Sequence, residues 1–133
     1  MSDESRILAG ILLLSLVTVE TGGLYMVKLW KSSEGVTPFQ IGFARAGHAH
    51  AGVLLIVGLL CQLYVDQTDL DGVWDWLARS GAPAAAILMP AGFFAASSGR
   101  GRETPNRFIA VVFAGAVVLA VGLATLGIGL LTA

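Results

Sequence analysis

The sequence predicts an all-α fold: a polytopic membrane protein whose residues 1–133 form a single four-transmembrane-helix bundle. Hydrophobic residues make up 56% of the chain and charged residues only 13%, whereas a soluble domain carries about 25% charged residues. The charged residues also gather in clusters that separate four apolar segments. Each segment is close to the ~20 residues that a helix needs to cross the hydrocarbon core of a bilayer.

The first two helices are predicted over about residues 7–27 and 38–64. The first follows the acidic start Met-Ser-Asp-Glu-Ser and lacks the short apolar core and small-residue cleavage site of a signal peptide, so we expect it to be retained. The second follows Thr37-Pro38, where threonine can cap the helix and proline can take the first helical position.

The last two helices are predicted over about residues 82–98 and 105–132. Pro90 lies inside the third helix and is expected to kink it, because proline has no N–H to donate to the preceding turn. The fourth helix is expected to begin at Thr104-Pro105, which repeats the start of the second helix.

The distribution of basic residues predicts the orientation. The predicted loops before the second and fourth helices lie on one side and carry most of the basic residues, which are Lys28, Lys31, Arg100, Arg102 and Arg107. Acidic residues dominate the other side. The positive-inside rule then places both termini outside the cytoplasm, in the cytoplasmic membrane of a prokaryote. The lipid bilayer is the expected partner, and nucleic acid is not, because the net charge is −1 and no long basic block is present.

The candidate site lies in residues 44–52, which contain both histidines of the chain, His48 and His50. An ionisable group at bilayer depth is costly, so it usually faces a bundle interior, a cavity, a cofactor or a metal. With a rise of ~1.5 Å per residue, Glu20 of the first helix falls in a similar layer. The alternative is an ion-pair network, with Arg45, that only fixes helix packing.

The two histidines are two residues apart, so on a helix they point about 200° away from each other and cannot both ligate one ion without distortion. We expect one to bind a cofactor or metal and the other to face a neighbouring helix, a second subunit or a proton path. Met89 in the third helix is a candidate second axial haem ligand, although a methionine more often fills a core.

The segment Ala46-Gly47-His48-Ala49-His50-Ala51-Gly52-Val53-Leu54 resembles the histidine-x-histidine helix of small four-helix membrane proteins related to the haem-copper oxidase catalytic subunit. The resemblance covers mainly the first two helices, with Glu20-Thr21-Gly22-Gly23-Leu24-Tyr25 at a similar distance before the histidines. It implies that His48 or His50 ligates haem. The later predicted helices carry no histidine, so one chain lacks the copper ligands and the high-spin haem ligand of an oxidase.

The leading hypothesis is a membrane haem- or metal-binding protein, an oxidoreductase component that acts in electron transport, diatomic gas binding or redox sensing. Its cofactor would be one haem b, ligated by His48 or His50 with Met89, or a copper or iron ion whose candidate ligands are one of the two histidines, His48 or His50, and Glu20. The same histidine of a second chain could supply a missing ligand. No catalytic residue is identified.

Three further expectations remain open. A stripe of small residues, Ala116, Ala120 and Ala124 continued by Gly127, could form the interface of a homo-oligomer or a seam within one chain. The chain could instead conduct protons or ions through Glu20, His48 and His50. It could also be an accessory subunit that contacts other respiratory membrane subunits.

Overall fold

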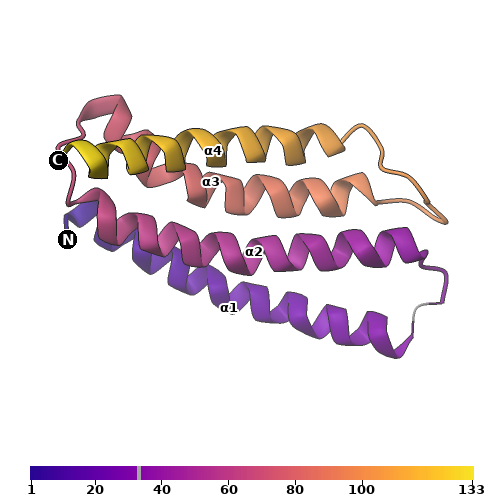
Figure 1. Cartoon of the computed structure of the whole chain (residues 1–133). Helices are drawn as coiled ribbons and strands as arrows, with labels where there is room; N and C mark the ends of the chain where they lie inside the picture. Colours follow the sequence, from indigo (N-terminus) through magenta and orange to yellow (C-terminus); the bar gives the residue numbers. More distant parts are fainter. Residues whose placement is uncertain (33) are drawn as a thin grey trace.

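A computed structural model of the chain, which describes residues 1–32 and 34–133, is entirely helical (Figure 1). In order, the helices are α1 (Asp3–Lys31), α2 (Pro38–Val65), α3 (Gly72–Ala96) and α4 (Ile109–Thr132). Consecutive helices run antiparallel, so both termini lie at one end of the molecule (Figure 1). The predicted all-α class is confirmed.

In the described part of the chain, three helices are long and apolar enough to cross a membrane: α1, α2 and α4. Helix α3 is not among them, because prolines, glycines and alanines make up much of it and its first turns carry Asp75 and Arg79. The membrane character predicted from composition is therefore seen in three of the four helices.

Helix α2 begins at Pro38, as its sequence predicts. The Thr37 hydroxyl accepts a hydrogen bond from the Gln40 N–H, and the Gln40 side chain accepts one from the Thr37 N–H, which completes a capping box. The Gln40 amide also donates to the carbonyls of Ser97 (2.9 Å) and Gly99 (2.6 Å). The start of α2 is thereby fastened to the end of α3.

Three helix starts differ from the prediction. Helix α1 begins at Asp3 rather than near residue 7. Helix α3 begins at Gly72 rather than near residue 82, because the charged segment is itself helical and pairs Asp75 with Arg79 one turn later. Helix α4 begins at Ile109, and the expected cap at Thr104 is wrong. Asn106 holds this segment outside the helix, since its backbone N–H donates to the Ala96 carbonyl.

The closest packing lies between α3 and α4, where glycines let the two backbones approach. A methyl group added at Gly122 would lie 2.7 Å from the Cα of Gly81, and one at Gly115 would lie 2.6 Å from the Met89 side chain. Ala120 and Ala124 are exposed instead. The seam within the chain therefore follows the glycines of α4 rather than the predicted alanine stripe.

A buried arginine joins three helices at the end that holds the termini. Arg79 of α3 is 5% exposed. It donates to both carboxylate oxygens of Asp75, at 3.1 and 2.7 Å, and lies 3.3 Å from Asp66 at the end of α2. It also donates to the hydroxyls of Ser2 and Ser5. Because a buried charge is costly unless it is paired, this network fixes how α1, α2 and α3 meet.

Substituting Gly122 with alanine should destabilise the bundle, because the new methyl group would overlap the backbone of Gly81 and force α3 and α4 apart. Overpacking of this kind costs about 1–3 kcal/mol. Gly127→Ala on the same helix is the control, since nothing lies within 4 Å of a methyl group there. Thermal unfolding in detergent should show a lower midpoint for Gly122→Ala only; equal midpoints for the two variants would contradict the packing.

Acid should weaken the Arg79 network. Burial alone would raise the pKa of Asp66, but hydrogen bonds from the Ser2 N–H, from the hydroxyls of Ser2 and Ser5 and from Arg79 hold this pKa below its usual value. The ionised carboxylate therefore stabilises the fold above its ordinary pKa of about 4, and this contribution is lost as the pH falls through the lower folded-state pKa.

The measurement is thermal unfolding between pH 7 and about pH 3. Asp66→Asn should be less stable than wild type at pH 7 and should lose less stability on acidification. Asp69→Asn, at an exposed carboxylate in the same loop, should follow the wild-type curve. If Asp66→Asn kept the full wild-type slope, Asp66 would not be the group responsible.

Candidate functional site

The two histidines of α2 face different neighbouring helices, as their spacing predicts. His48 points at α1, where its ring fills a notch left by two glycines. A methyl group at Gly22 would lie 2.9 Å from Nδ1 of His48, and one at Gly23 would lie 3.9 Å from Nε2. Because any larger residue would displace the ring, His48 acts as a wedge between α1 and α2.

His50 points at α3 and is half-buried. Its Nδ1 lies 2.7 Å from the Ala46 carbonyl, and its ring centroid is 4.9 Å from that of Phe93. A carbonyl only accepts, so Nδ1 carries the hydrogen, and in the neutral ring Nε2 presents a lone pair. Metal-bound histidines are commonly oriented in this way, by a hydrogen bond from the other ring nitrogen.

Aromatic rings extend from His50 toward the start of α2. The Phe93 ring meets Phe43 edge to face at 5.5 Å, and Phe43 lies 4.3 Å from Phe39. These contacts hold the His50 ring in an apolar setting. The sequence analysis did not identify these phenylalanines, because they lie on two helices and nothing in the local pattern joins them.

Neither Glu20 nor Met89 is among the residues that His48 and His50 contact. Glu20 is exposed; it follows Val19, which faces Gly52 of α2, so it is turned about 100° away from that contact. Met89 is buried and packs against Gly115 of α4. Across residues 1–32 and 34–133, no three His, Cys, Asp or Glu side chains lie close enough to hold a metal ion. The predicted group of Glu20, His48 and His50 is therefore not assembled within one chain.

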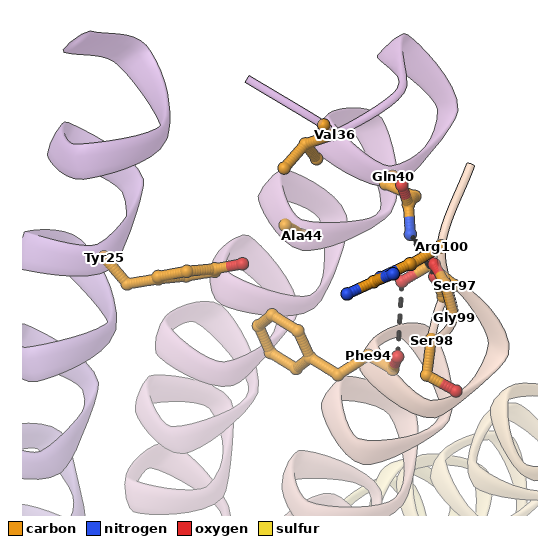
Figure 2. A pocket seen from close by; sticks show the side chains of 10 residues that line it. Tyr25, Val36, Gln40, Ala44, Phe94, Ser97, Ser98, Gly99 and Arg100 are labelled. Carbon is orange, nitrogen blue, oxygen red and sulfur yellow. Dashed lines mark hydrogen bonds between the residues drawn. The ribbon is translucent and has the colours of Figure 1, made fainter. Parts of the chain in front are cut away.

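A second candidate site is a cavity of about 300 Å³ at the end of the bundle opposite the termini. Its walls come from α1, α2, α3 and the loops before α2 and after α3. Figure 2 shows Tyr25 and Arg100 reaching across it toward one another. Phe94 forms its apolar floor between them. The remaining lining residues are Gly35, Val36, Gln40, Ala44, Ser97, Ser98 and Gly99.

Sequence reasoning missed this cavity. It placed Arg100 in a basic loop and Tyr25 near the end of a helix, but the two are 75 positions apart in the chain. The hydrogen bonds from Gln40 to the end of α3 bring the two segments together, and the capping pattern at Thr37 does not predict them.

A second cavity of about 240 Å³ lies farther along the same side of α2, between α1 and α3. Its lining is mainly aliphatic, with Ser15 and Ser80 as the polar exceptions; the apolar residues are Leu8, Ile11, Leu12, Leu55, Pro83, Ala84 and Ile87. Both cavities are lined by residues of α1 and α3 on one side of α2, and the space between α1 and α3 that holds them is called the groove.

Comparison of the chain with protein-family models, with curated proteins and with solved structures gave no match.

Substituting Gly22 with valine should displace the His48 ring while leaving His50 in place, because only His48 contacts this part of α1. In spectra of protein labelled with 15N-histidine, one imidazole should change its signals and the other should not. Gly10→Val is the control on the same helix, since nothing lies within 4 Å of a Cβ atom there. A spectrum unchanged by Gly22→Val would contradict the wedge.

Proposed function

We propose that the chain is an integral membrane protein whose four helices all lie in the bilayer, with both termini outside the cytoplasm, and that it binds a b-type haem through His50. Its role would be electron transfer, diatomic gas binding or redox sensing. Helix α3 belongs to the membrane domain in this proposal because it packs between α2 and α4, and its Arg79 is neutralised by two aspartates near one end.

The observation that carries the proposal is the orientation of His50. The hydrogen bond from Nδ1 to the Ala46 carbonyl fixes the tautomer, and the Phe93 ring restricts rotation of the imidazole. Such a ring is preorganised to donate its Nε2 lone pair to an iron centre. His48 is the weaker candidate ligand, because its ring is already enclosed against Gly22 and Gly23.

Of this chain's residues, His50 would hold the haem through its Nε2 atom. Met89 lies in the core against α4, so a further ligand would come from water or from His50 of a second copy. A bound haem supplies a metal centre that accepts and releases one electron. The protein's own residues would orient one ligand and surround it with apolar aromatic rings, which are the features that tune such a centre.

Assembly into a homo-oligomer is supported by the position of Glu20. This carboxylate is exposed on α1, one of the helices apolar enough to span a membrane. At the centre of a bilayer an ionised side chain that faces lipid costs about 3 kcal/mol or more. A second copy of the chain packed against this face would remove Glu20 from lipid.

Proton or ion conduction through Glu20, His48 and His50 and an accessory role in a respiratory assembly are the competing proposals. The absorption spectrum of protein purified in mild detergent, oxidised and then reduced with dithionite, separates them from haem binding. A Soret band that shifts on reduction is expected. Its absence after growth with added haem would overturn the haem proposal.

Replacing His50 with alanine should abolish the Soret band or reduce it at least tenfold, because no other oriented imidazole remains. His48→Ala should keep most of the haem, with lower thermal stability from the emptied notch between α1 and α2. Met89→Leu, which preserves the volume at the α3–α4 seam, should keep all of it. Haem loss in His48→Ala with retention in His50→Ala would reverse the assignment of the ligand.

A further inference from the structure

We propose that the groove between α1 and α3 binds an anionic phospholipid, with its phosphate between Arg100 and Tyr25 and an acyl chain along α3. This inference rests on the membrane placement proposed above and is independent of the haem. It assigns a role to the cavity of Figure 2, which neither histidine lines.

The polar groups of the cavity suit a phosphate. Within residues 1–32 and 34–133 no carboxylate forms an ion pair with Arg100, and its guanidinium points over the cavity toward the Tyr25 hydroxyl (Figure 2). Gln40 is already engaged, because its amide donates to the Ser97 and Gly99 carbonyls. The hydroxyls of Ser97 and Ser98 donate to carbonyls of the last turn of α3. The side-chain donors that remain are therefore a guanidinium and a phenol, which match phosphate oxygens.

The charge of this end of the bundle favours an anionic headgroup. The loops and helix ends that surround the cavity carry five basic residues against two acidic ones, Glu34 and Glu103; the basic residues are Lys28, Lys31, Arg100, Arg102 and Arg107. The positive-inside rule assigns this end to the cytoplasmic surface. Anionic lipids are concentrated in that leaflet, where nearby basic residues attract them.

The two cavities are separated along α1 by about the depth of one leaflet. Half of a hydrocarbon core of ~30 Å is about 15 Å. Tyr25 borders the headgroup cavity and Ser15 borders the aliphatic cavity; they are ten residues apart on α1, or about 15 Å. An acyl chain that starts beside Phe94 would therefore reach the rim of the second cavity.

Ala91 occupies the middle of this path. It lies four residues after Ile87, which lines the aliphatic cavity, and three residues before Phe94, which lines the headgroup cavity. Residues with this spacing share one face of a helix, and Ala91 is exposed. The small side chain keeps the groove open, and an aromatic side chain at this position would block it.

The test uses the full chain in nanodiscs that contain equal amounts of phosphatidylglycerol and phosphatidylcholine. The lipids that remain bound after release from the discs are counted by native mass spectrometry. Wild type should retain phosphatidylglycerol, and Arg100→Gln should retain about tenfold less, as expected when a charge-assisted contact is lost. Arg100→Lys should restore part of the binding. Arg107→Gln is the control, because it removes an exposed charge from the same end outside the cavity.

Equal loss in Arg100→Gln and Arg107→Gln would overturn the site, because it would indicate attraction to the whole basic surface. Ala91→Phe should lower retention of the long-chain lipid without changing the binding of glycerol 3-phosphate. If glycerol 3-phosphate displaced the lipid at similar concentrations, the ligand would be a soluble phosphate ester and the lipid proposal would be wrong. Failure of the chain to enter nanodiscs would contradict the membrane placement instead.

Discussion

The pairing of Arg79 is the interaction on which the arrangement of the helices depends. A guanidinium that is 5% exposed is tolerated only because Asp66, Asp75 and two serine hydroxyls satisfy it. These partners come from α1, from the end of α2 and from α3, so the charge holds three helices at one end of the bundle. Toward the other end α1 diverges from α2 (Figure 1), and the cavity lined by Tyr25 and Arg100 lies there.

Helix α2 presents its two histidines to different neighbouring helices. Its period of 3.6 residues turns His48 toward the glycines of α1 and His50 toward Phe93 of α3. A short motif that resembles a ligand pair is thus separated into a packing residue and an oriented imidazole. The proposed haem would bind on the side of His50, whereas the proposed lipid would bind in the groove between α1 and α3. The two proposals therefore concern different surfaces of one helix.

Small residues serve two purposes in this fold. In α4 they allow the backbone to meet α3 at Gly81 and Gly122, which compensates in packing for the apolar contacts that glycine lacks. In α1 Gly22 makes room for an imidazole. The exposed alanines of α4, Ala120 and Ala124, neither bring two backbones together nor make room for a side chain within one chain. A sequence pattern of small residues predicts close approach of some kind, and the neighbouring element decides what approaches.

The sequence by itself determined the helical class, the number of helices and the start of α2, because these depend on local hydrophobic length and on the Thr37–Gln40 cap. It also indicated that the two histidines would diverge. Only the tertiary structure decided that α3 begins ten residues earlier than predicted, that Glu20 is exposed, that Met89 packs on α4 and that Tyr25 meets Arg100 across a cavity. The physical reason is that periodicity fixes the direction of a side chain about its own helix axis, whereas its partner depends on how the helices pack.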